Sequence, residues 1–154
     1  MRMVWHVYFR KGKVYVPTVA RAEAGYYLNV EPVAVVDADD FGGMLSAIQA
    51  AIERGNPVVP TLTRTQADAM KPVIPRLAGV KSWPQFERQA LTWSMEKSAD
   101  EYRIVPGRRA LDGGWVDDEA ETETLPPGTT AEAVAMRVAQ MIQGVAKVPS
   151  KQKE

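Results

Sequence analysis

A dense acidic stretch is the feature of this sequence best suited to chemistry with a partner. Its acids lie within seven residues: Asp117, Asp118, Glu119, Glu121 and Glu123. In an extended chain the last three would project from one face, about 6–7 Å apart. Like charges so close repel one another unless a cationic partner neutralises them. Two interpretations follow: a solvated acidic loop, or a docking surface for a basic protein.

One tryptophan stands directly before this stretch. Trp115 follows the turn Asp112-Gly113-Gly114, whereas the apolar faces around the other three tryptophans predict core packing for Trp5, Trp83 and Trp93. We therefore expect Trp115 to be the partly exposed one, and exposed tryptophan is a common anchor of protein interfaces. The predicted partner-binding residues are Trp115, Asp117, Asp118, Glu119, Glu121 and Glu123.

A second group of carboxylates, Asp37, Asp39 and Asp40, offers a different chemistry. Clustered carboxylates can hold a hard divalent cation or work as acid and base. The further ligands and the glycine of a calcium loop are absent, and aspartates at a helix start cap its free N–H groups. Capping is the interpretation we adopt. The alternative function is a small enzyme or a ligand- or metal-binding protein with its site here, which predicts a concave pocket and a strongly shifted carboxylate pKa.

Other chemistry is sparse. The chain has no cysteine, which excludes disulfides, thiolate catalysis and cysteine zinc sites and fits a reducing cytosol. His6 is the single histidine, and we expect a partly buried strand residue rather than a catalytic base. Neither a phosphate-binding glycine loop nor a G-x-S-x-G elbow occurs. The sequence therefore predicts a protein without enzymatic activity, with no catalytic residue, no metal and no cofactor.

Charge and hydropathy limit the class of partner. Nineteen basic residues balance nineteen acidic ones among 154, so the net positive charge typical of a nucleic-acid binder is missing. The amino terminus does not resemble a signal peptide, and no apolar run approaches 18 residues. We expect a soluble cytoplasmic protein that binds neither nucleic acid nor membrane, and whose oligomeric state the sequence leaves open.

The strands that must position these residues follow from alternating side chains. A hairpin is predicted from residues 3–10 and 14–16 around Gly12, with Pro17 limiting the second strand or placing it at an edge. Further strands are expected at 25–28, 32–36, 91–96 and 101–105. The uninterrupted apolar character of 32–36 predicts a central position in the sheet.

Two main helices follow from three- and four-residue spacing. The first is capped by Asp39 or Asp40, carries apolar residues from Phe41 to Ile52 and ends at Gly55. The second opens at Thr129 and ends at Gly144. Shorter helices are expected after Thr65 and after Ser82, on either side of proline-broken chain.

Hairpin-like runs of strands with helices between and after them predict an α+β fold. We expect an antiparallel or mixed sheet with the two main helices packed against it. Because no repeat or linker interrupts the chain, residues 1–146 should form a single domain, followed by a flexible polar tail at 147–154.

Three passages resemble a known family. The opening from Trp5 to Pro17, the passage from Gly79 to Trp83 and the acidic stretch before the last helix are similar to small bacterial immunity proteins of contact-dependent growth inhibition systems. The resemblance extends over most of the chain. It implies a protein that binds and neutralises a cognate, nuclease-like toxin, with acids steering association to a basic cleft and Trp115 adding buried contact area.

Overall fold

The structure, a computed structural model, describes residues 2–110 and 114–146. The predicted tail at 147–154 and most of the predicted 112–114 turn lie outside these residues. No helix in the described part of the chain is both long enough and apolar enough to cross a bilayer.

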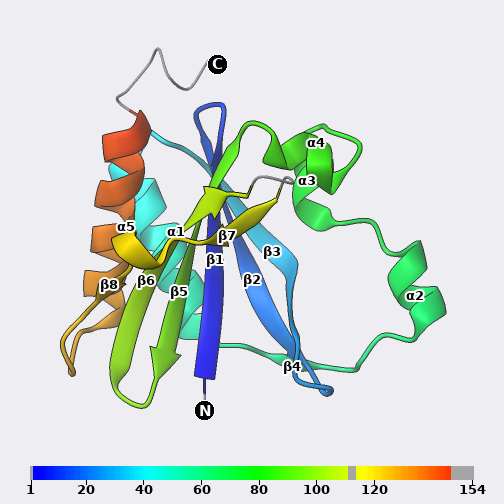
Figure 1. The fold of residues 1–154 in the computed structure, drawn as a ribbon, viewed down its shortest axis with the longest axis horizontal. Coiled ribbons are helices and arrows are strands. Elements are labelled where there is room, and N and C mark those ends of the chain that lie inside the picture. The colour runs from blue at the N-terminus through cyan, green and yellow to red at the C-terminus, as the bar shows by residue number, and fades with distance from the viewer. Residues whose placement is uncertain (1, 111–113, 147–154) are drawn as a thin grey trace.

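The described residues form an open, eight-stranded sheet (Figure 1). Its strands are β1 (Arg2–Arg10), β2 (Lys13–Ala22), β3 (Tyr27–Asp37), β4 (Val58–Val59), β5 (Ala90–Ser98), β6 (Glu101–Arg109), β7 (Trp115–Asp117) and β8 (Glu123–Thr124). The order is β3-β2-β1-β5-β6-β7, with β8 also on β6. All pairs are antiparallel except β4, which runs parallel to β2.

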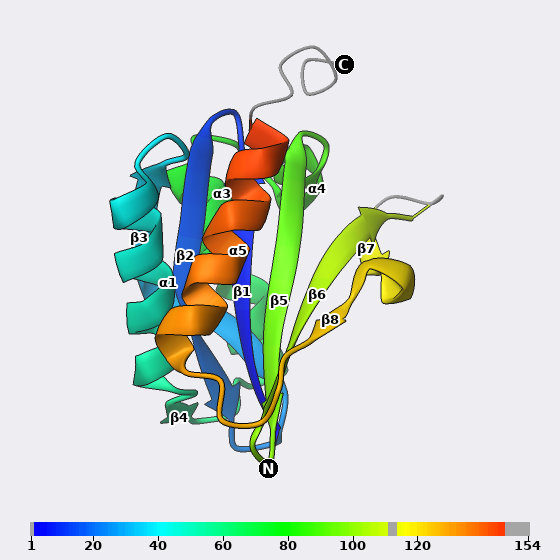
Figure 2. The ribbon, with the colours of Figure 1, turned by 90° about the vertical axis from the view of Figure 1, so that its left-hand side faces the viewer.

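Helices cover both faces of this sheet unequally. The elements are α1 (Phe41–Arg54), α2 (Arg64–Ala69), α3 (Val73–Leu77), α4 (Trp83–Glu87), the 3₁₀ turn η1 (Glu119–Glu121) and α5 (Ala131–Ala146). Figure 2 shows the long helices α1 and α5 side by side on one face. The predicted α+β class, with two main helices on a mostly antiparallel sheet, is confirmed.

The main core lies between the sheet and these two helices. Alternation in β1 turns Trp5, Val7 and Phe9 toward the helices, and all three are buried. They meet the apolar stripes of α1 and α5, which include Met44, Ile48, Val134, Val138 and Ile142. Burying each such side chain contributes about 1.5–3 kcal/mol, so this layer holds the helices in place.

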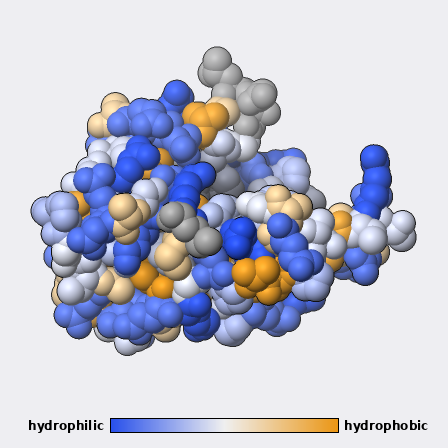
Figure 3. All heavy atoms as spheres, turned by 90° about the horizontal axis from the view of Figure 1, so that it is seen from below, coloured by the Kyte–Doolittle hydropathy of each residue, from blue (hydrophilic) through white to orange (hydrophobic). Residues whose placement is uncertain are grey.

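A smaller core covers part of the opposite face. Tyr8 and Tyr15 pack there against Ile74 of α3 and Phe86 of α4. Helix α2 takes no part in either core: none of its residues is buried, and it protrudes from the body (Figures 1 and 3).

Asn56, just after α1, fills the gap where β1 and β2 diverge. The two strands pair directly only between Tyr8–Arg10 and Lys13–Tyr15. The Asn56 amide donates to the carbonyls of Val4 and Val19 at 2.8 and 2.9 Å and accepts from the Val4 amide at 3.1 Å. One side chain thus replaces missing ladder hydrogen bonds.

The predicted helix starts at Asp40 and Ser82 are confirmed, the latter by a hydrogen bond from the Gln85 amide to Ser82 Oγ at 3.3 Å, and two others are shifted. Asp40 accepts a hydrogen bond from the Gly43 amide at 2.9 Å and caps α1. Thr130, not Thr129, accepts from Ala133 at the start of α5, which continues past Gly144. Thr63, not Thr65, caps α2, because Gln66 completes a capping box with it.

The expected strands at 25–28 and 32–36 form the single strand β3, and the prediction of a central position is wrong. β3 lies at the sheet edge. Its apolar run has another cause: Ala34 and Val36 face the main core, Val33 faces α3, and Val35 is 46% exposed. Pro17 does not end β2 either, because the β2–β3 register shifts between Pro17 and Thr18, where a missing N–H is tolerated.

Candidate partner-binding site

The acidic stretch does not form one extended strand. Asp117 ends β7, Glu119 and Glu121 belong to the turn η1, and Glu123 begins β8. The Asp118 amide donates to the Pro106 carbonyl at 2.8 Å, which ties the turn to β6. The Thr122 hydroxyl donates to the Asp118 carbonyl at 2.9 Å and closes the turn. The extended arrangement that would align Glu119, Glu121 and Glu123 is therefore not adopted.

Arginines of the same chain neutralise two of these acids. Arg137 of α5 donates to both carboxylate oxygens of Glu123, at 2.9 and 2.6 Å. These hydrogen bonds hold the pKa of Glu123 below its ordinary value, despite an opposing effect of burial. Glu119 lies 3.5 Å from Arg103, which also lies 3.4 Å from Glu96. Glu123 and, more loosely, Glu119 thus serve internal contacts.

The remaining three acids form no ion pair among the described residues. These are Asp117, Asp118 and Glu121; Asp117 and Glu121 are exposed and Asp118 is half-buried. They lie within the segment that folds back along β6 (Figure 2). We name this segment, β7 with η1 and β8, the acidic edge. Its free negative charge is concentrated on these three residues.

Trp115 is half-buried, so most of its ring serves the fold. It lies 5.8 Å from the Tyr8 ring and 5.9 Å, edge to face, from the Trp83 ring, measured between centroids. Its indole Nε1 is buried and has no hydrogen-bond partner in the described part of the chain. Trp115 therefore fixes β7 against α4, and the neighbouring Val116, 41% exposed, is the apolar side chain that β7 presents outward.

A groove runs between the acidic edge and α5. It has a volume of about 380 Å³ and an apolar lining that includes Leu91, Trp93, Pro106 and Met141. Glu121, Glu123 and Arg137 also line it. Leu91 alternates along β5 with Trp93 and Met95 and lies with them on the helix-covered face. Its 37% exposure could not be predicted, because it depends on how far α5 extends across β5 and β6.

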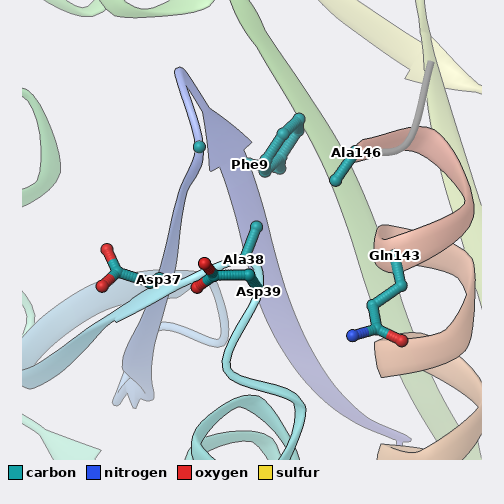
Figure 4. A pocket seen from close by; sticks show the side chains of 7 residues that line it. Phe9, Asp37, Ala38, Asp39, Gln143 and Ala146 are labelled. Carbon is teal, nitrogen blue, oxygen red and sulfur yellow. The ribbon is translucent and has the colours of Figure 1, made fainter. Parts of the chain in front are cut away.

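The alternative site at Asp37, Asp39 and Asp40 also adjoins a hollow. It measures about 660 Å³ and is lined by Phe9, Gly12, Asp37, Ala38, Asp39, Gln143 and Ala146. Figure 4 shows the carboxylates of Asp37 and Asp39 on one side of the hollow and the Gln143 amide on the other. A concave pocket near the start of α1 is therefore present.

The three aspartates of this alternative site differ in their contacts. Asp40 caps α1, and Asp37 forms an ion pair with Lys13 across the β2–β3 pair. Asp39 is left as the only one of the three without a side-chain partner among the described residues. No three histidine or acidic side chains converge there, or elsewhere in residues 2–110 and 114–146, to hold a metal ion. The arrangement fits capping better than metal chemistry.

His6 is a partly buried strand residue, as predicted. Its Nδ1 lies 3.0 Å from Oδ1 of Asn29, whose amide donates to the Tyr8 hydroxyl at 3.0 Å. Burial lowers the pKa of His6 and raises the pKa of Tyr8 to about 12. Both groups are therefore held neutral at physiological pH inside a hydrogen-bonded chain.

Comparisons with known proteins place the fold. No family model matches this sequence, and no curated protein matches it. A chain of the CdiA-CT/CdiI toxin and immunity complex from Yersinia pseudotuberculosis is similar in structure, with a TM-score of 0.63 at 11% identity, over 92% of this chain and 97% of that one. A protein of unknown function from Neisseria meningitidis has a TM-score of 0.60 at 11% identity, over 92% and 94%.

At such identities the likeness is one of fold. It covers 92% of this chain and nearly the whole of each neighbour. The resemblance to toxin–immunity proteins noted in the sequence is thus matched by a structural neighbour from such a complex.

Proposed function

We propose that this chain is a non-enzymatic immunity-type protein that binds a basic, nuclease-like toxin in the cytoplasm and blocks it through the acidic edge. The structural neighbour from a toxin and immunity complex supports the kind of protein. The observation that carries the choice of surface is the set of three acids without an ion pair to the described residues, Asp117, Asp118 and Glu121, on a segment fixed to the sheet.

Fixation matters because binding costs conformational entropy. The Asp118–Pro106 hydrogen bond and the packing of Trp115 hold the acids in place before a partner arrives. A pre-ordered surface loses less entropy on binding than a free loop. Its negative charge steers a cationic partner toward the acidic edge and then pairs with the positively charged groups of a basic cleft.

Charge-neutral substitutions at the three free acids test this proposal. The variant Asp117→Asn/Asp118→Asn/Glu121→Gln removes three negative charges from the acidic edge. The control Glu23→Gln/Asp68→Asn/Glu101→Gln removes three from exposed positions elsewhere. Each tagged protein is used to capture partners from the native host, with mass spectrometry as the readout.

We expect one basic protein in stoichiometric amount with the wild type and the control, reduced at high salt and absent with the acidic-edge variant. Equal capture by all three proteins would refute the choice of surface. Recovery of the wild type alone would refute the proposed function.

The hollow beside Asp37 and Asp39 favours a second candidate function, a carboxylate-based site for a ligand or a metal ion. A ligand or divalent cation bound there would stabilise the folded state by mass action. A thermal shift with Mg²⁺, Ca²⁺ or a metabolite that disappears in Asp39→Asn would favour the carboxylate-based alternative. On the immunity proposal, Mg²⁺ and Ca²⁺ leave the melting temperature unchanged.

A further inference from the structure

We infer that the groove between α5 and the acidic edge receives a cationic side chain with an aliphatic stem, a lysine or an arginine, from the partner. This inference rests on the proposed function and adds to it a specific pocket. The groove is defined by Leu91, Trp93, Pro106, Glu121, Met141 and Gly144.

The apolar floor suits the stem of such a side chain. Leu91 of β5 is 37% exposed although it lies on the helix-covered face, and Trp93 and Pro106 continue the floor across β5 and β6. Met141 of α5 forms the opposite wall, and methionine adapts to irregular apolar groups. Lysine and arginine bury their methylene stems along such surfaces while the charged group stays at the rim.

The charge at the rim favours a cation over an anion. Three charged residues line the groove, and Glu123 and Arg137 cancel each other in a two-hydrogen-bond pair. Glu121 has no ion-pair partner among the described residues, so the lining carries one uncompensated negative charge. Gly144 belongs to the last turn of α5, where the helix dipole is also negative.

The size and the neighbourhood of the groove agree with this occupant. A volume of about 380 Å³ lies at the lower end of the roughly 300–1,000 Å³ typical of ligand pockets, which suits one side chain better than a helix. Asp118, next to η1, adds negative charge outside the groove. A basic partner attracted to the acidic edge thus finds an apolar recess beside it.

Gly144 allows the groove to be filled without disturbing the fold. A Cβ atom added there would meet nothing within 4 Å, and helical glycine is unfavourable compared with alanine. Gly144→Leu should therefore fold normally and occupy the groove with its side chain. Gly144→Ala is the matched control, because it changes the same backbone position and leaves the groove open.

The probe is N-butylguanidinium, compared with the neutral isostere N-butylurea. Binding to the full chain is followed by NMR titration of the Leu91 and Met141 methyl groups and the Trp93 indole. Millimolar binding of the cation is expected, about two- to five-fold tighter than that of the urea, the ratio for one partly exposed ion pair. Glu121→Gln should abolish this preference, and Gly144→Leu should abolish binding of both compounds, whereas Gly144→Ala should not.

Equal binding of the two compounds, or perturbations that avoid these three residues, would overturn the inference. Because the titration needs no partner protein, its failure is distinguishable from failure of the proposed function. Partner capture with the Gly144 variants separates the two further. Capture that is unaffected by Gly144→Leu but lost with the acidic-edge variant would leave the function intact and refute the groove.

Discussion

At the scale of single residues, Glu123 and Glu121 lie two positions apart and have different surroundings. Glu123 is bound by Arg137, whereas Glu121 faces the groove without an ion-pair partner in the described chain. The density of acids is visible in the sequence, but this division is not. It depends on Arg103 of β6 and Arg137 of α5, which the fold brings next to the acidic stretch. The sequence therefore reveals the charged segment, but it does not reveal which of its acids form ion pairs within the fold.

Replacing Glu123 tests its structural role. Arg137 lowers the pKa of Glu123 in the folded state, so the pair stabilises the fold above the ordinary pKa of 4.5, and this stabilisation is lost as pH falls through the lower folded value. Both side chains are more than a third exposed, which limits the contribution to under about 1 kcal/mol. Glu123→Gln should lower the free energy of unfolding by up to that amount at pH 7 and by less at pH 3. Urea denaturation at both values measures it.

Glu121→Gln is the control for that experiment, since the Glu121 carboxylate forms no ion pair with any residue that the structure describes. An equal loss of stability in Glu121→Gln at pH 7 would show that the Glu123–Arg137 contact has no special effect.

His6 gives the protein a second pH dependence in a different range. Burial lowers its pKa from 6.5 in the folded state, so the unfolded chain binds more protons between the two values. Stability is therefore full above about pH 6.5 and falls below it, by up to roughly 1.4 kcal/mol per pH unit until the folded pKa is reached. In His6→Gln this slope should vanish. Denaturation curves between pH 7.5 and 5.5 decide the matter, and a slope retained in His6→Gln would contradict the assignment.

At the scale of elements, local patterns predict helices better than they predict the sheet. The spacing from Phe41 to Ile52 and the cap at Asp40 lie within one short segment, so α1 is fully predictable. The edge position of β3 is not, because strand order is set by contacts between distant segments. An apolar run such as 32–36 has the same appearance at a central strand and at an edge strand covered by α1 and α3.

The first turn of α1 offers a matched pair of glycines. A Cβ at Gly43 would lie 2.4 Å from Asp40 Oδ2 and 2.8 Å from a Val36 methyl, whereas a Cβ at Gly42 would meet nothing within 4 Å. Gly42→Ala should raise the free energy of unfolding by up to about 1 kcal/mol through helix propensity. Gly43→Ala should lower it by about 0.5–2 kcal/mol, because the capping side chain must move. Thermal or urea denaturation that ranks the two variants in the opposite order would refute the cap geometry.

At the scale of the whole molecule, a neutral chain carries separated charges. Nineteen acids and nineteen bases cancel in total, yet three acids without an ion-pair partner in residues 2–110 and 114–146 are gathered on one edge of the sheet beside an apolar groove. The composition lacks the net positive charge typical of a nucleic-acid binder, and the fold gathers part of the negative charge into a localised surface. The hairpin-rich order of elements predicts the α+β class, but only the assembled sheet brings the acidic edge against α5.

The most direct test of the central claim is the association rate constant of the captured partner, measured by stopped flow at several salt concentrations. We expect the rate to fall about tenfold or more between low and high ionic strength. At low salt the acidic-edge variant should associate more slowly by a similar factor, and the control with three acids removed elsewhere should match the wild type. An association rate that is independent of salt and equal in all three proteins would contradict the account.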